Sequence, residues 1–183
     1  VSVINSYAFG GTNVKNILLI ENKKDDVNAI YISEGLRRIE NSAFETEDWT
    51  FRSESNKLER VELPASFVYY GEDVFRGKHI GNFFVSEENT AFSSIDGVLY
   101  DKNLEQILRY PPLRAYVEEY EIYPGVFQIA DYAFYYMKSC EKITLPDTIE
   151  ANGIGKYAFY QALISHLDMS NAKNVTTISD GMC

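Results

Sequence analysis

A short phrase that recurs along the chain is the strongest constraint on its fold. In four places an Ile stands five positions before the Phe of an Ala-Phe pair: Ile4 and Phe9, Ile39 and Phe44, Ile129 and Phe134, and Ile154 and Phe159. Two looser copies keep the same offset, Tyr70 before Phe75 and Ile178 before Cys183. A fixed offset that recurs in this way marks an internal repeat and predicts a stacked repeat architecture.

A second phrase, apolar-x-x-apolar-x-apolar, occurs between most of these copies. Its last three positions alternate between apolar and polar residues, which predicts a short strand with one buried face. Pro64 and Pro146 follow two copies and end their strands. The crossover length makes successive strands parallel neighbours, and no coil can bury its apolar residues alone, so we expect a solenoid. The middle residues of the phrase are Ile17, Ile30, Val61, Phe83, Tyr120, Ile143 and Leu167.

Composition excludes several classes of protein. The 183 residues are 45% hydrophobic and 24% charged, which is typical of a globular chain, and we expect one domain over residues 1–183. The net charge of −10 argues against a nucleic-acid partner, because phosphate contacts need a basic patch. No apolar run approaches the roughly 20 residues of a membrane span. The chain begins at Val1 with neither an initiator Met nor a signal peptide, so we expect a processed or excised piece of a larger protein.

The phrase from Ile129 to Phe134, followed by Cys140-Glu141-Lys142-Ile143-Thr144-Leu145-Pro146, resembles the BspA-type leucine-rich repeat. Segment 92–112 is similar to a hairpin unit interleaved in the same family. The resemblance implies an α/β solenoid: a right-handed coil with a parallel sheet on one side and short helical turns or irregular loops on the other. It also implies a secreted or cell-surface protein of a gut or oral bacterium, or of a mucosal protist, that adheres rather than catalyses. The family supplies no fixed ligand residues.

The hairpin and one insertion can be recognised from their own residues. Two strand-forming runs, 98–100 and 107–110, are separated by turn-forming residues, and Pro111-Pro112 prevents the second run from continuing. Asp96 and Asp101 could form a cation site, but turn chemistry is the better interpretation because Ca²⁺ needs more carboxylates. The polar segment at about 45–57 is interpreted as a surface insertion.

Catalytic and metal motifs are not found. The chain has two His, His79 and His166, and carries no HExxH, P-loop, GxSxG or zinc-type Cys spacing. We therefore expect no catalytic residues, no metal and no cofactor. His166 and Asp168 should share one face of a strand, with Ser165 on the opposite face, and could form half of an acid–base pair; an exposed polar strand is the simpler interpretation. Cys140 and Cys183 occupy different apolar places of separate repeats, so we expect free thiols.

The outward strand face is the expected binding surface. Parallel stacking arranges outward side chains in columns, so that single contacts add up to an extended surface. Phe84 is a candidate anchor for a partner or a sugar ring, unless the insertion or the hairpin covers it. The candidate ligand-binding residues are Arg60, Glu62, Asn82, Phe84, Lys142, Thr144, His166 and Asp168.

Three functions follow from these features. The first is a non-catalytic module that binds a host or microbial surface protein or a glycan at the cell surface or outside the cell. The second is an enzyme or a glycan-processing accessory with a site in the insertion or near His166 and Asp168. The third is a structural spacer in a larger surface protein. The ends of the solenoid expose core residues and unpaired strand edges, so end-to-end self-association is also expected.

Overall fold

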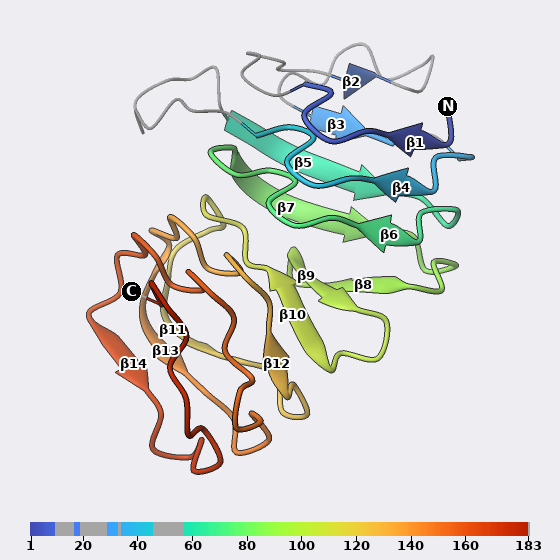
Figure 1. The fold of residues 1–183 in the computed structure, drawn as a ribbon. Helices are drawn as coiled ribbons and strands as arrows, with labels where there is room; N and C mark the ends of the chain where they lie inside the picture. Colours follow the sequence, from blue (N-terminus) through green and yellow to red (C-terminus); the bar gives the residue numbers. More distant parts are fainter. Residues whose placement is uncertain (10–16, 19–28, 33, 46–56, 183) are drawn as a thin grey trace. The chain divides into compact units, whose positions relative to one another are not determined.

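A computed structural model describes residues 1–9, 17–18, 29–32, 34–45 and 57–182 (Figure 1). The insertion expected at about 45–57 and Cys183 therefore lie largely or wholly outside the described residues. The chain divides into two compact units, Val1–Ser94 and Ile95–Cys183. Within the described ranges the regular structure consists of strands, and turns connect them without a helix. The family resemblance implies either helical turns or irregular loops between the strands. The described segments have irregular loops.

Two parallel sheets form the first unit (Figure 1). One sheet contains β1 (Val3–Ile4), β4 (Arg38–Ile39) and β6 (Tyr69–Tyr70); the other contains β2 (Ile17–Leu18), β3 (Ala29–Tyr31), β5 (Lys57–Leu63) and β7 (His79–Val85). The register confirms both sequence phrases. In the first sheet Ile4 pairs with Ile39 and Ile39 with Tyr70; in the second the pairs follow Ile17, Ile30, Val61 and Phe83 in order.

The second unit repeats this arrangement. Strands β11 (Val117–Glu121), β13 (Cys140–Thr144) and β14 (His166–Asp168) form a parallel sheet in which Tyr120 pairs with Ile143 and Ile143 with Leu167. Strand β8 (Phe92–Ile95) crosses the boundary between the units. The predicted hairpin is confirmed, because β9 (Val98–Asp101) and β10 (Gln106–Arg109) pair antiparallel. Strand β10 also pairs in parallel with β12 (Gln128–Ile129), and a bridge joins Ile129 to Ile154.

The two Asp residues considered for a cation site both lie at turns of the hairpin region. The Asp101 carboxylate accepts the backbone N–H groups of Glu105 and Gln106, each at 2.8 Å. Asp96 has a positive φ of 50° in the turn between β8 and β9. The preferred interpretation of these residues, turn formation, is confirmed for Asp101.

Stacked aromatic rings occupy the core behind the strands. The rings of Phe9, Phe44 and Phe75 follow one another with centroids 5.0 and 5.2 Å apart. In the second unit Tyr110 takes the first place of the equivalent stack, followed by Phe134 and Phe159 at 5.2 and 4.9 Å. Burial of a Phe side chain contributes about 1.5–3 kcal/mol, so these stacks are a large part of the stability of each unit.

The backbone repeats the same hydrogen bond at four of the stacked rings. The N–H of the ring-bearing residue donates to the carbonyl of the residue that precedes the ring in the next coil, at Phe9, Phe44, Tyr110 and Phe134. Thus Phe44 donates to Val74 at 2.9 Å and Phe134 to Ala158 at 2.7 Å. Val74 is buried in the place of the usual Ala, so this position accepts a larger side chain than Ala.

The residue two places before each stacked Phe adopts a left-handed backbone. Tyr7, Ser42, Asp73, Tyr132 and Tyr157 have φ between 53° and 58°, although none of them is glycine. The sixth copy has Gly181 at this place, with φ of 63°. The left-handed region costs an L-residue about 1–2 kcal/mol, and hydrogen bonds between coils offset this cost. The Tyr132 N–H, for example, donates to the Lys156 carbonyl at 3.1 Å.

An Asn or Asp side chain joins adjacent coils where the next coil has glycine. The Asn41 Oδ1 accepts the Glu72 N–H at 3.0 Å, and the Asp131 Oδ1 accepts the Lys156 N–H at 2.7 Å. A Cβ at Gly71 would lie 2.6 Å from the Asn41 nitrogen, and a Cβ at Gly155 would lie 2.5 Å from the Asp131 nitrogen. Glycine at these two places therefore permits the close approach that the side-chain hydrogen bond needs.

Candidate binding site on the outward strand faces

The first unit presents the predicted outward residues on β5 and β7. Arg60 pairs in register with Asn82, and Glu62 pairs with Phe84. The alternate residues Val61 and Phe83 point inward and are fully buried. The structure therefore brings these four predicted residues together on one face of a parallel sheet.

Arg60 connects the polar and aromatic parts of this face. Its Nε lies 2.6 Å from the Glu62 Oε1, and its guanidinium carbon lies 3.9 Å from the centroid of the Phe84 ring. Phe84 is 41% exposed, while most of the insertion that was considered as a cover for it lies outside the described residues. The arginine therefore restrains an aromatic ring that still reaches solvent.

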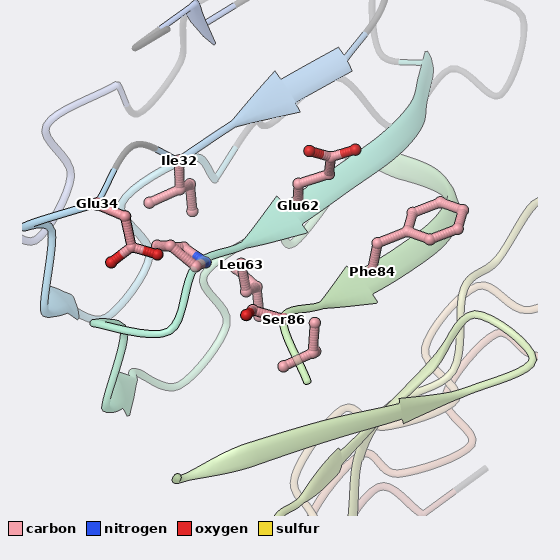
Figure 2. A pocket seen from close by; sticks show the side chains of 8 residues that line it. Ile32, Glu34, Glu62, Leu63, Phe84 and Ser86 are labelled. Atoms are coloured by element: carbon pink, nitrogen blue, oxygen red, sulfur yellow. The ribbon is translucent and has the colours of Figure 1, made fainter. Parts of the chain in front are cut away.

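A hollow of about 320 Å³ lies beside Phe84, at the carboxyl ends of β3, β5 and β7 (Figure 2). Its floor and walls are mainly apolar, and Glu34 and Glu62 supply two carboxylates. Figure 2 shows Glu62 and Phe84 on neighbouring strands, with Glu34 extending from the chain that follows β3. The lining residues are Ile32, Glu34, Glu62, Leu63, Pro64, Phe84, Val85 and Ser86.

Sequence reasoning missed Glu34 as a member of this site. Its Oε1 accepts the Ala65 N–H at 2.9 Å, and its Oε2 accepts the Ser66 N–H at 3.2 Å. These bonds hold the carboxylate in one orientation on the turn after β5. The sequence carries no signal for this role, because Glu34 lies between strand phrases and its partners are about 31 residues away.

The second unit presents a charged column instead of an aromatic one. Lys142 pairs in register with Glu119 and with His166, while Thr144 pairs with Glu121 and with Asp168. The Lys142 Nζ lies 2.7 Å from the Glu119 Oε1 and 3.6 Å from the Asp168 Oδ2. The four predicted residues of this unit, Lys142, Thr144, His166 and Asp168, therefore share one outward face.

Mutual contacts set the protonation of this charged column. The Lys142 side chain, which donates to Glu119, lowers the pKa of the Glu119 carboxyl, and Thr144 Oγ1 also donates to it at 2.7 Å. The same contact with Glu119 raises the pKa of the Lys142 ammonium. The backbone N–H of Ser170 is the main cause that lowers the pKa of Asp168. These groups are charged at neutral pH and largely satisfy one another.

The two residues of the suggested acid–base pair lie on the same strand, and the carboxylate of Asp168 already has other partners. His166 and Asp168 both lie on β14, and the Asp168 carboxylate accepts the Ser170 N–H at 3.0 Å and faces Lys142. The Ser165 hydroxyl donates to the Glu141 carbonyl at 3.2 Å. The described residues contain no group of three or more His, Cys, Asp or Glu side chains that could hold a metal ion.

Two further findings concern the cysteines and the membrane. Cys140 is a buried free thiol, and burial raises its pKa; Cys183 lies outside the described residues, so the expected free thiol there stays a prediction. Over the part of the chain that the structure describes, no helix has the length and apolar character needed for a membrane crossing.

Comparisons with known proteins agree with this arrangement. A family model described as the BspA type leucine rich repeat region matches in six copies, over residues 1–95 and 114–182. A comparison with curated proteins gives no match.

Three solved structures share the fold. A leucine rich cell surface protein from Faecalibacterium prausnitzii A2-165 is 22% identical, with a TM-score of 0.67, and the match covers 82% of this chain and 37% of that one. The pneumococcal vaccine antigen PcpA is 24% identical over 92% of this chain and 48% of its own, with a TM-score of 0.58. A leucine-rich repeat protein from Eubacterium ventriosum ATCC 27560 is 19% identical over 92% of this chain and 51% of its own, with a TM-score of 0.58. The chain thus spans about half, or less, of the length of each of these three proteins. At these identities the similarity shows a shared fold.

Proposed function

Because this chain belongs to the BspA-type leucine-rich repeat family, we propose that it is a non-catalytic binding module of a secreted or cell-surface protein. In this proposal it attaches to a surface protein or glycan of a host or neighbouring cell through its outward strand faces. The names of two structural neighbours support a surface location, since one is a cell surface protein and the other a vaccine antigen.

The observation that carries the proposal is the common register of the outward side chains. Residues from β5 and β7 in the first unit, and from β11, β13 and β14 in the second, meet in columns because their strands are parallel and in phase. A partner that lies across such a face contacts several coils at once, so modest contacts add to a useful affinity. The exposed Phe84 ring gives the first unit an anchor of the kind that dominates binding energy in protein interfaces.

An array of immobilised matrix proteins and glycans, probed with the purified chain, tests this proposal. We expect at least one ligand whose binding weakens roughly tenfold in Phe84→Ser, because an aromatic anchor contributes about 1.4 kcal/mol or more. Lys142→Ala and Arg60→Ala test the two faces separately. Lys138→Ala is the matched control, because Lys138 is exposed and lies outside the outward strands. Ligands that bind all of these variants equally would reject the strand faces as the binding surface.

A further inference from the structure

The hollow beside Phe84 has the shape and charge of a site for one long cationic side chain. We propose that it receives a lysine or arginine from an extended segment of a partner protein. This inference rests on the proposed function and names the chemistry of the partner at one place on the face.

The size of the hollow supports a side chain as the occupant. Its volume of about 320 Å³ lies at the lower end of the range of small-ligand pockets, about 300–1,000 Å³. Its apolar lining, which includes Ile32, Leu63 and Pro64, suits the methylene stem of a lysine or arginine. The hollow lies at the ends of three parallel strands, so a segment that crosses the strand face can place a side chain in it without displacing a coil.

The charge of the lining favours a cation. Glu34 and Glu62 both line the hollow, and the lining includes no lysine, arginine or histidine. Arg60, which is not part of the lining, pairs with Glu62 and compensates its charge, so the net negative charge of the hollow comes from the Glu34 carboxylate. Two backbone N–H groups already orient Glu34, which reduces the entropy that a charged partner must lose on binding. The net charge of −10 extends the attraction for cations beyond the hollow itself.

Phe84 supplies the specificity for a long side chain. Arg60 shows that a guanidinium packs against this ring at 3.9 Å within the chain itself. A ring edge and apolar floor contact the stem of the incoming residue while its head reaches Glu34. A short cation without a stem fills less of the hollow and gains less from these contacts.

Fluorescence anisotropy with labelled ten-residue Ser/Gly peptides tests the inference. One peptide carries lysine at alternate positions, and its matched partner carries acetyl-lysine at the same positions. We expect the lysine peptide to bind at low salt, and the acetylated peptide to bind at least roughly tenfold more weakly, because a charge-assisted hydrogen bond is lost. We expect Glu34→Gln to give a similar loss, since the amide can still accept one backbone N–H and keep the turn.

Glu88→Gln is the matched control, because it removes the same charge from an exposed residue that does not line the hollow. Equal losses in Glu34→Gln and Glu88→Gln would overturn the inference in favour of general attraction to an acidic surface. Equal binding of the lysine and acetyl-lysine peptides would also overturn it, as would a neutral oligosaccharide that binds through Phe84 while the lysine peptide does not. Far-UV circular dichroism of each variant ensures that a loss of binding is not a loss of fold.

The two proposals fail in different ways. An array ligand whose binding depends on Phe84 or Lys142 but not on Glu34 would keep the strand face as the binding surface and overturn the cationic site. The opposite result is an array ligand that binds all strand-face variants equally, together with a lysine peptide whose binding is lost in Glu34→Gln. It would support the cationic site and overturn the wider function.

Discussion

At the scale of single residues, Asn89 closes the turn after β7 by satisfying all the polar atoms of its buried amide. Its Nδ2 donates to the carbonyls of Pro64 and Phe67 at 2.7 and 2.8 Å. Its Oδ1 accepts the N–H groups of Ala91 and Phe92, each at 2.8 Å. The residue is 1% exposed, so these four bonds replace contacts with water.

Asn89→Asp should therefore destabilise the first unit by about 3 kcal/mol at neutral pH. The new carboxylate faces two carbonyl oxygens and loses both donors, and an unsatisfied buried polar group costs about 1–3 kcal/mol, more when it is charged. Urea unfolding followed by near-UV circular dichroism measures the change. Asn103→Asp, at an exposed turn, should change stability by less than about 0.5 kcal/mol; an equal effect of the two variants would contradict the role of the buried amide.

Tyr116 provides a prediction about pH at the surface of the second unit. Its hydroxyl donates to the Glu141 Oε1 at 2.7 Å, and this bond is the main cause that raises the pKa of the phenol from 10.0 to about 12. Because the folded pKa lies above the unfolded one, this contact stabilises the fold fully below pH 10 and is lost as the pH rises from 10 to 12. In NMR titration of ring-labelled tyrosine, Glu141→Gln should return the Tyr116 pKa toward 10; an unchanged pKa would disprove the contact.

At the scale of secondary-structure elements, the strand registers could be predicted and the connections between them could not. Ile143, for example, pairs with Tyr120 and Leu167 as the repeated phrase requires, because apolar periodicity depends on which face is buried. The left-handed Tyr132 and Tyr157 carry no such signal, because tyrosine rarely adopts this backbone and tertiary hydrogen bonds hold it there. Of the candidate site, the outward residues follow from alternation, whereas Glu34 depends on a turn that no local pattern specifies.

The close approach at Gly155 gives a prediction at this scale. Gly155→Ala places a Cβ 2.5 Å from the Asp131 nitrogen, and backbone atoms cannot move as a flexible side chain can. We expect a loss of about 2–3 kcal/mol in the free energy of unfolding, in the range of overpacked sites. Urea titration measures it. The neighbouring Lys156→Ala keeps the N–H that bonds to Asp131 and should be nearly neutral; similar losses in both variants would show that the side chain, and not the close approach, matters.

At the scale of the whole molecule, exposed apolar residues and net charge act in opposite directions on self-association. β14 is an edge strand of its sheet, and Leu163 and Ile178 in the last coils are 64% and 61% exposed. Such an edge favours pairing with a second copy. The charge of −10 on each copy opposes it, and salt screens this repulsion over roughly 10 Å at 0.1 M.

We therefore expect self-association through this edge to increase with salt. Sedimentation velocity at neutral pH should show a larger dimer fraction in 0.5 M than in 0.02 M sodium chloride. Leu163→Glu should reduce that fraction at both salt concentrations, because it removes exposed apolar area and adds charge. Asn103→Glu, at the exposed turn of the hairpin, adds the same single negative charge elsewhere and serves as the control. A dimer fraction that is independent of Leu163 would place any association at another surface.

The repeated hydrogen bond behind the stacked rings has an evolutionary consequence. Phe134 donates to Ala158, and Phe159 donates in the same way to Met182, so each of these coils offers its successor the same N–H donor and ring that it received from its predecessor. A duplication or deletion in the coding sequence that spans one such coil would join equivalent surfaces. Copy number in this lineage can therefore vary by whole coils while the interior of the neighbours stays intact.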